Sequence, residues 1–522
     1  MKKIYSIIFV GASLLVMNGC IDSEDEITAE LLKDVDSGET LQITSGSADF
    51  SNYIAIGNSI TAGLMDGALY NGGQSRSYPN LMANQMLPAG GGSFNQPDIN
   101  SQDGFNILAS DPGNGVIVGR FVLDTSIPGP VTLPNGDITS VLTPYTGSVN
   151  NFGIPGARVV DLVSDLYGTP DVTGDGFPEG NPFYVRIASN PIGPGGSTVL
   201  GDAAMAGGSF VSFWIGQNDL LGYLASGGTS EDVTDNPAAI ANPSSLTDEV
   251  NFTGALGAVV ATLTSGGQEG VIANLLDASF SPFFRAVPYN ALPLDQATAD
   301  LLMFGPSGTG ADGFLGFNAG LDQLAGLGAI TQADADSRKI SFVAGQNALL
   351  IEDDNLLDIS VFNPALAGRG QIRQITSTEL VLLTAATVIG TTPDGFPPTA
   401  IYGASLGMPD NLVLTADELT LHATRLAAFN GIIADVASVN DLATVDMYNL
   451  FIGIALNGGI EAGGQMLAPD FSPNGIFSTD GVHPNPRGQA IIANAFIDAI
   501  NNKYGSNLQE IDVLNLPGVS TL

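Results

Sequence analysis

Residues 53–63 read YIAIGNSITAG: a short apolar run, a glycine, and then small polar residues. This order is typical of a buried strand of a parallel sheet that opens into a functional loop. Two later runs, SFVSFWIG at 209–216 and GVIANLL at 270–276, have the same character, and ATVDM at 443–447 is a weaker example. The sequence therefore predicts several buried strands.

Helical patterns alternate with these strands. In residues 246–263, large apolar side chains recur at helical spacing on one face. A second helix is predicted over residues 416–437, because Thr415 and Glu418 match a capping box ahead of an apolar stripe. A third helix is predicted over residues 485–501. Strand and helix in alternation predict an α/β fold.

Two stretches interrupt this alternation. Residues 286–414 are loop-rich, and we interpret them as an insertion or cap. A smaller insertion, at about 88–149, is predicted to contain a hairpin that includes residues 116–123. The strand-like pieces of the larger insertion are 340–343, 348–351 and 379–383.

The charge of the chain excludes one class of partner. Its 15 Lys and Arg residues against 53 Asp and Glu residues give a net charge of −38. A field of this sign repels the phosphate backbone, so nucleic acid is not an expected partner. An acidic composition mainly increases solubility, and it does not indicate which of the remaining kinds of partner the protein binds.

The N-terminus has the parts of a secretory signal. Lys2 and Lys3 precede an apolar run over residues 4–17, which is short for a permanent membrane span. The only cysteine of the chain, Cys20, follows directly, in a context that resembles a lipobox. By that resemblance, residues 1–19 are a lipoprotein signal peptide and Cys20 is lipidated.

Residues 20–47 are polar and acidic without clear periodicity, and we interpret them as a flexible tether. Acidic residues directly after the cysteine also resemble the surface-export signals of Bacteroidetes lipoproteins. We therefore expect a secreted chain that is anchored to the outer membrane through Cys20, on its periplasmic or its surface side. An outer-membrane transport partner is one option that this location leaves open.

Four separated segments carry the groups that a serine needs for acyl transfer: a hydroxyl, an imidazole, a carboxylate that orients it, and donors for an oxyanion. In chain order they are GNSITAG at 57–63, NFGIPGARVVDL at 151–162, IGQNDLLGY at 215–223 and STDGVHPNPRGQAII at 478–492.

These segments resemble blocks I, II, III and V of the SGNH (GDSL-type) hydrolases, in the order of that family. The resemblance implies a three-layer α/β/α, flavodoxin-like fold with a parallel sheet and large insertions. The hydrolase core would comprise residues 48–285, with the smaller insertion inside them, and residues 415–522, which also include a C-terminal tail. The resemblance also implies cleavage of carboxylic esters through an acyl-enzyme, with no metal and no organic cofactor.

The family's site residues can be carried over onto the matching positions. By resemblance, Ser59 is the nucleophile, His483 the general base, and Asp480 the carboxylate that orients His483. The backbone N–H groups of Ser59 and Gly156 and the side-chain amide of Asn218 would form the oxyanion hole. Asp480 and His483 are three residues apart, so one loop can hold both.

Simpler interpretations of the same residues stay open. Ser59, Asn218 and Asp219 could each cap a helix, and Gly156 could be a turn glycine. The only other histidine, His422, lies on the predicted amphipathic helix, where we expect a partly buried histidine with satisfied hydrogen bonds.

Two local features, Asn58 and residues 171–180, match their expected patterns only in part. Asn58 stands where the family usually has Asp, and its amide keeps an acceptor for a turn hydrogen bond. The segment DVTGDGFPEG at 171–180 partly matches a calcium loop, but Pro182 stands at the twelfth position, where an acidic ligand is expected. We interpret this segment as a solvated acidic turn.

The substrate is less well defined than the reaction. Residues 280–305 are rich in large apolar side chains, which favours a lid over a lipid or another long-chain ester, although packing of the insertion explains them equally well. An acetylated glycan is the close alternative. A non-catalytic surface lipoprotein that binds lipid or glycan on the same fold is a different hypothesis, motivated by Asn58 and by the size of the insertion.

Overall fold

A computed structural model describes residues 42–124, 126 and 129–519. The predicted signal peptide, Cys20 and most of the predicted tether lie outside these residues. From Ser45 onward the described chain belongs to a single unit. Within the described part, no helix combines the length and the apolar character that crossing a membrane requires.

Five parallel strands form the central sheet, in the order β13-β6-β5-β1-β4. Counted along the chain, these strands stand in the order 2-1-3-4-5, which is the flavodoxin-like arrangement. The predicted fold class is therefore confirmed. The strands are β1 (Tyr53–Gly57), β4 (Asn151–Gly153), β5 (Phe210–Trp214), β6 (Glu269–Ala273) and β13 (Ala443–Val445).

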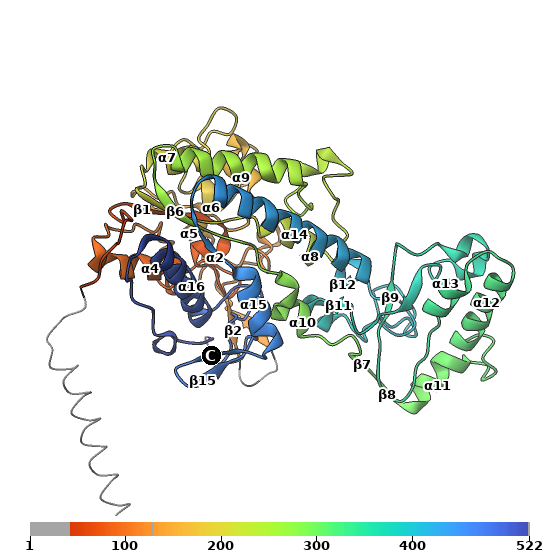
Figure 1. Cartoon of the computed structure of the whole chain (residues 1–522). Helices are drawn as coiled ribbons and strands as arrows, with labels where there is room; N and C mark the ends of the chain where they lie inside the picture. Colours follow the sequence, from red (N-terminus) through yellow and green to blue (C-terminus); the bar gives the residue numbers. More distant parts are fainter. Residues whose placement is uncertain (1–41, 125, 127–128, 520–522) are drawn as a thin grey trace, which may run out of the picture. The chain divides into compact units, whose positions relative to one another are not determined.

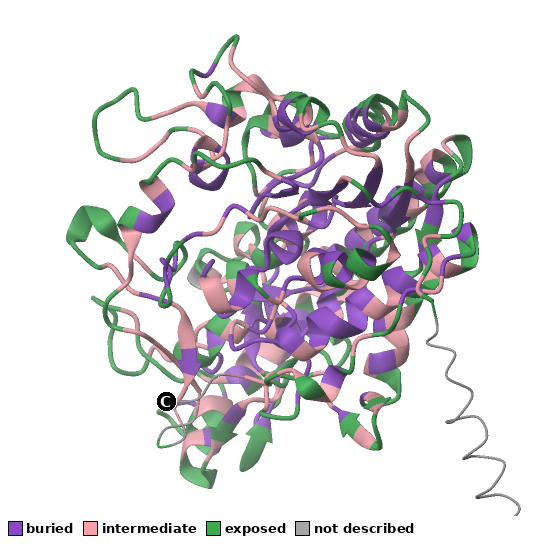
Figure 2. Ribbon diagram, turned by 90° about the vertical axis from the view of Figure 1, so that its left-hand side faces the viewer, coloured by how far each residue is buried: buried purple, intermediate pink, exposed green. Residues whose placement is uncertain are grey.

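The position of β1 explains the composition of its sequence. All five of its residues are buried, with Ala55 paired to Asn151 of β4 on one side and to Ser212 of β5 on the other. Buried residues are concentrated in the sheet and in the helices beside it (Figure 2). A strand covered on both faces needs apolar residues at successive positions, as YIAIG supplies.

Helices cover both faces of the sheet, which gives the three-layer arrangement (Figure 1). On one face, α9 (Glu249–Thr264) packs against α14 (Ala416–Val439), with the rings of Phe252 and Phe429 stacked. On the other face, α16 (Pro486–Tyr504) packs against α4 (Tyr78–Met86). The three predicted helices are thus confirmed as α9, α14 and α16, and the N–H of Thr415 before α14 donates to Oε2 of Glu418 (2.6 Å).

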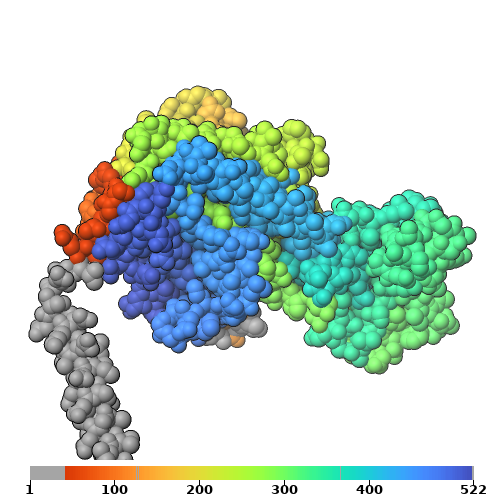
Figure 3. All heavy atoms as spheres, in the orientation of Figure 1, coloured from red at the N-terminus to blue at the C-terminus, as the bar shows by residue number. Residues whose placement is uncertain are grey.

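The larger insertion has a hydrophobic core of its own, and its residues gather in one lobe (Figure 3). The pieces predicted at 348–351 and 379–383 are confirmed as short strands, β9 and β11, but three helices were not predicted. Its elements are β7 (Leu292–Leu294), α11 (Gln296–Phe304), α12 (Phe314–Gly326), α13 (Gln332–Ser337), β8 (Gly345–Asn347), β9 (Leu350–Glu352), β10 (Ile372–Gln374), β11 (Leu380–Val381) and β12 (Val413–Leu414).

The strand predicted at 340–343 is wrong. Its backbone N–H groups bond to side chains instead of to a neighbouring strand: that of Ile340 donates to Asn318 Oδ1 (2.9 Å), and that of Val343 donates to Asn347 Oδ1 (2.9 Å). Side-chain acceptors of this kind satisfy an extended segment without a β-ladder.

The hairpin of the smaller insertion begins later than predicted. Its arms are β2 (Phe121–Leu123) and β3 (Pro130–Thr132), whereas Val116 makes only an isolated bridge with Asp111. The remaining helices and strands are α2 (Ser59–Ala62), α3 (Asn71–Gln74), α5 (Ile138–Leu142), α6 (Pro182–Val185), α7 (Val199–Met205), α8 (Asn218–Ala225), α10 (Pro282–Arg285), α15 (Met447–Leu456), β14 (Ile460–Ala462) and β15 (Gln465–Leu467).

Candidate active site

Ser59 is the first residue of α2, directly beyond the carboxyl end of β1. A side chain at Gly57 would collide with Thr61 and would lie 2.7 Å from the carbonyl oxygen of Trp214, so the sharp turn requires glycine there. Asn58 caps α2, and its Oδ1 accepts from the N–H of Ile60 (3.1 Å). The turn hydrogen bond expected of Asn58 is therefore present.

The loop before α16 brings His483 and Asp480 to Ser59. Nε2 of His483 lies 2.8 Å from Oγ of Ser59, and Nδ1 of His483 lies 2.9 Å from Oδ2 of Asp480. Oδ1 of Asp480 also accepts from the backbone N–H groups of Val482 and His483, at 2.9 Å each. A hydroxyl, an imidazole and a carboxylate thus form one continuous chain of hydrogen bonds, as a serine hydrolase requires.

The environment of Asp480 favours the ionised form of its carboxylate. Burial alone would raise the pKa of Asp480, but the charge of His483 and the hydrogen bonds from His483 and Val482 outweigh burial and lower that pKa to about 2. An ionised Asp480 accepts from Nδ1–H of the imidazole and leaves Nε2 free to accept a proton from Ser59.

A second carboxylate, Asp66, supports the loop of Asp480 and His483. Its Oδ1 accepts from the N–H (3.0 Å) and the hydroxyl (2.7 Å) of Thr479, and its own N–H donates to Oγ of Ser478 (2.9 Å). The next residue, Gly67, donates its N–H to Oδ2 of Asp480 (2.8 Å). Sequence reasoning missed Asp66, because it lies more than 400 residues from the loop it holds and matches no block.

The two remaining predicted donors follow β4 and β5, the strands on either side of β1: Gly156 lies in the loop after β4, and Asn218 is the first residue of α8, at the end of the loop after β5. Parallel strands end at the same edge of a sheet, so these loops lie beside Ser59. Nδ2 of Asn218 donates to the carbonyl oxygen of Ala157 (2.9 Å), which joins the two loops directly. Among the described residues, no acceptor is found for the N–H of Gly156. The N–H of Ser59 belongs to the first turn of α2, where helices offer no internal acceptor.

Asp219 does not cap α8, which was one interpretation of its sequence position. It is fully buried, and its Oδ2 accepts from the N–H of Val159 (2.9 Å) in the loop after β4. Burial raises the pKa of Asp219 to about 7. Asn218 and Asp219 therefore hold the same loop at two points, two residues apart.

The structure does not connect His422 with Ser59 by any hydrogen bond among the described residues. The expectation of a partly buried, satisfied histidine is wrong: His422 is buried, with Nδ1 at 3.9 Å from Asp277 Oδ1 and no hydrogen-bond partner for Nε2 in the described part of the chain. Burial lowers the pKa of His422 and so favours its neutral form. The helix α14 is packed more deeply at this point than its sequence indicated.

The acidic turn at 171–180 uses its carboxylates internally. Asp171 accepts from the N–H groups of Gly174 (2.6 Å) and Gly176 (2.9 Å), and Glu179 accepts from those of Val172 and Thr173. These bonds support the interpretation as a turn. Among the described residues, one group of three carboxylates comes close enough together to hold a cation: Asp354, Asp410 and Glu418, each with an oxygen within 4.8 Å of the others.

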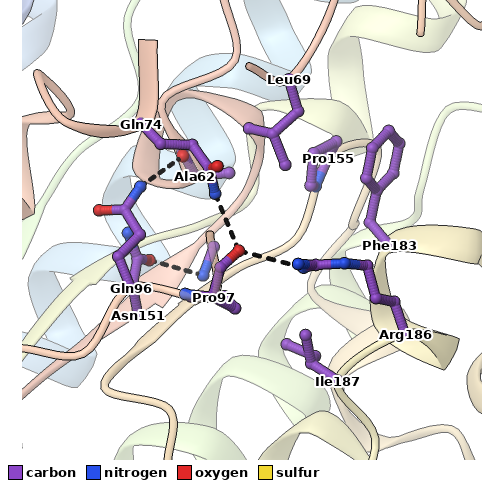
Figure 4. A pocket seen from close by; sticks show the side chains of 11 residues that line it. Ala62, Leu69, Gln74, Gln96, Pro97, Asn151, Pro155, Phe183, Arg186 and Ile187 are labelled. Atoms are coloured by element: carbon purple, nitrogen blue, oxygen red, sulfur yellow. Dashed lines mark hydrogen bonds between the residues drawn. The ribbon is translucent and has the colours of Figure 1, made fainter. Parts of the chain in front are cut away.

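A small pocket lies beside the end of α2 (Figure 4). Its volume of about 10 Å³ suits one water molecule and excludes an acyl chain. Around it, Nε2 of Gln96 donates to the carbonyl oxygen of Ala62 (3.0 Å), and Arg186 donates to that of Pro97 (3.0 Å). This pocket therefore marks where the smaller insertion supports α2.

Residues 304–496 match the family model described as GDSL-like lipase/acylhydrolase. The GDSL-like match includes Asp480 and His483 but not Ser59, Gly156 or Asn218. It supports the SGNH/GDSL family and a general acylhydrolase or esterase function, and the five-stranded parallel sheet between helix layers is consistent with the GDSL-type α/β/α fold. No curated protein and no solved structure matches the chain.

Proposed function

We propose that the chain is a serine esterase or acylhydrolase with Ser59 as nucleophile, His483 as general base and Asp480 as the carboxylate that orients it. The observation that carries this proposal is the chain of two hydrogen bonds from Ser59 Oγ to His483 (2.8 Å) and from His483 to Asp480 (2.9 Å). The GDSL-like match over residues 304–496 supports the same reaction class.

The reaction proceeds in two acyl transfers. Nε2 of His483 takes the proton of Ser59 as Oγ attacks the ester carbonyl carbon, and the N–H groups of Ser59 and Gly156 with the amide of Asn218 stabilise the oxyanion. His483 then gives the proton to the departing alcohol, which leaves an acyl-serine. Water, deprotonated by His483, attacks that ester; the acyl–Oγ bond breaks, the carboxylic acid leaves, and His483 returns the proton to Oγ of Ser59.

We favour a lipid or another long-chain ester as the substrate. The N–H of Phe283 in α10 donates to the carbonyl oxygen of Gly481 (2.9 Å), which places an aromatic residue directly against the loop of Asp480 and His483. The neighbouring Phe284 is buried and packs edge-on against Phe283. An apolar wall at this point suits an acyl chain better than an acetyl group on a glycan.

Turnover of p-nitrophenyl esters by the full-length chain tests the reaction. We expect Ser59→Ala to lower kcat at least about 10⁴-fold, because a triad cannot act without its nucleophile. The exposed Ser75→Ala is the matched control and should keep wild-type turnover. A wild-type chain that hydrolyses no ester would favour the alternative, a lipoprotein that binds lipid or glycan without cleaving it.

The same assay separates the two substrate classes. With a long-chain ester as the natural substrate, kcat/KM rises from the acetate to the decanoate, because each added methylene buries more apolar surface in the transition state. A steep fall beyond the acetate would contradict the lipid preference and favour deacetylation of a glycan.

We further propose that Cys20 carries a lipid that anchors the enzyme to the outer membrane, on its periplasmic or surface side, with an outer-membrane transport partner as one option. The lipobox-like context of Cys20 and the acidic residues after it support this location. Incorporation of a radiolabelled fatty acid into the wild-type chain and into Cys20→Ser tests it: equal labelling of both would contradict the anchor.

A further inference from the structure

The side chain of Asn181 uses every hydrogen bond that an amide can make. Its Oδ1 accepts from the N–H groups of Phe183 (3.0 Å) and Tyr184 (3.2 Å) and so caps α6. Its Nδ2 donates to the carbonyl oxygen of Pro155 (2.8 Å) and to the hydroxyl of Tyr167 (2.9 Å). Two donors and two acceptors fix which end of the amide is nitrogen.

The bond to Pro155 acts on the peptide unit that carries the N–H of Gly156. That unit is trans, so its C=O and N–H lie in one plane and point in opposite directions. A donor that holds the oxygen of Pro155 therefore sets the direction of the N–H of Gly156. Gly156 has a φ of +82°, and a glycine allows this unit more rotation than another residue would.

The other contacts of this loop act on different peptide units. Asn218 holds the carbonyl oxygen of Ala157, and Asp219 holds the N–H of Val159. Both fix the loop beyond Gly156. Among the described residues, Asn181 makes the only hydrogen bond to the peptide unit between Pro155 and Gly156.

The acidic turn at 171–180 helps to fix the backbone of Asn181. The turn at 171–180 closes on itself through Asp171 and Glu179, and the N–H groups of Gly180 and Asn181 donate to the carbonyl oxygens of Thr169 (2.9 Å) and Tyr167 (3.0 Å). The backbone of Asn181 is thus fixed before its side chain reaches Pro155.

We infer that Asn181 is a positioning residue: it holds the Pro155–Gly156 peptide so that the N–H of Gly156 points at the oxyanion of the tetrahedral intermediate. The inference rests on the proposed esterase function and deepens it. Asn181 touches neither the ester nor the triad. It acts through the orientation of one donor, and a misplacement of about 1 Å at such a donor can cost about 10²-fold in rate.

The decisive variant is Asn181→Ser, assayed as the full-length chain with p-nitrophenyl acetate. Serine is also a good N-cap and adds no charge, but it is too short to reach Pro155. We expect kcat to fall about 10-fold to 100-fold, less than for loss of a whole oxyanion donor. We expect KM to stay within about threefold, since the donor acts mainly in the transition state.

Tyr167→Phe is the matched control. It removes the other acceptor of Asn181 Nδ2 and leaves the bond to Pro155 in place, so kcat should stay within about threefold of wild type. The fraction of reactive Ser59, counted at completion with a fluorophosphonate, should be the same in all three chains. A fall in that fraction as large as the fall in kcat would show a merely structural role and overturn the inference.

Asn181→Asp is the second variant, in case serine unfolds α6. Aspartate has the same shape and the same capping oxygens, but it cannot donate to Pro155. If the wild type is active and Asn181→Asp keeps its kcat, Asn181 does not position Gly156. If the wild type reacts neither with esters nor with the fluorophosphonate, the proposed function itself fails, and the inference falls with it.

Discussion

Asp66 and Asn181 lie outside the four sequence blocks, yet each forms a hydrogen bond with a backbone group inside one of the blocks. The side chain of Asp66 accepts from the N–H of Thr479, next to Asp480, and the side chain of Asn181 donates to the carbonyl oxygen of Pro155, next to Gly156. In both cases a side chain fixes a backbone unit rather than a reacting atom. A reactive geometry in this fold therefore depends on hydrogen bonds that connect distant parts of the chain.

The role of Asp480 can be tested by an isosteric change. In Asp480→Asn, the acceptors for the N–H groups of Val482 and His483 can remain, but the amide no longer stabilises a protonated His483. We expect kcat to fall by about 10³-fold to 10⁴-fold while the chain stays folded. Ester turnover and circular dichroism measure the two quantities.

The control for this change is Asp435→Asn, which removes an exposed carboxylate from α14. It changes the net charge by the same amount and should leave kcat unaltered. If Asp480→Asn lost less than about tenfold in kcat, Asp480 would not be the carboxylate that orients His483.

At the scale of whole elements, the sequence predicted those with a strong local signal. A strand buried on both faces of the sheet, such as β1, has a continuous apolar sequence. The helix α14 is preceded by Thr415, which with Glu418 matches the sequence of a capping box. The edge strand β4 was not predicted as a strand, because three residues are too few for any periodicity. The helix α12 was missed for a different reason: it contains three glycines, and glycine lowers helix propensity by about 1 kcal/mol per residue relative to alanine.

In the candidate site too, only the residues that belong to a local sequence motif could be predicted. The block residues Ser59, Asp480 and His483 carry their own sequence signal, and the structure brings them within hydrogen-bond distance. Asp66 and Asn181 carry none, because their role depends on which backbone group the fold places opposite them. Such contacts follow from tertiary structure and not from local pattern.

The packing of α9 on α14 gives a prediction for stability. Phe429 is fully buried, and its ring stacks on Phe252 with 3.8 Å between centroids and 8° between planes. We expect Phe429→Ala to lower the free energy of unfolding by about 3–5 kcal/mol through lost burial and a residual cavity. Urea denaturation followed by circular dichroism measures the change.

Phe429→Leu separates the two causes, since leucine refills part of the cavity and should cost clearly less than alanine. The exposed Val439→Ala at the end of the same helix is the control, and we expect a change within about 0.5 kcal/mol. Equal losses in Phe429→Ala and Val439→Ala would contradict the packing of α9 on α14.

At the scale of the molecule, the chain has a net charge of −38, and the fold brings some of its acidic groups close together. Asp354 and Asp410 of the insertion meet Glu418 of α14, with oxygens of all three within 4.8 Å of one another. Burial, and then the neighbouring carboxylates, raise the pKa of Asp410 to about 6 and that of Glu418 to about 7. The contact between insertion and core therefore weakens when these groups ionise.

This cluster predicts how stability depends on pH. The folded chain keeps the proton of Glu418 up to about pH 7, whereas the unfolded chain releases it near the ordinary value of 4.5. Between these values the folded chain binds more protons, so this group makes the free energy of unfolding fall as pH rises.

In Glu418→Gln, the amide oxygen can still accept from the N–H of Thr415, but the side chain no longer titrates. We therefore expect Glu418→Gln to gain stability relative to wild type between pH 5 and pH 8, as measured by urea midpoints at both pH values. Asp417→Asn removes an exposed carboxylate from the same helical turn and is the control for the loss of one negative charge. A Glu418→Gln difference that does not change with pH would mean that Glu418 is already ionised in the folded chain at pH 5.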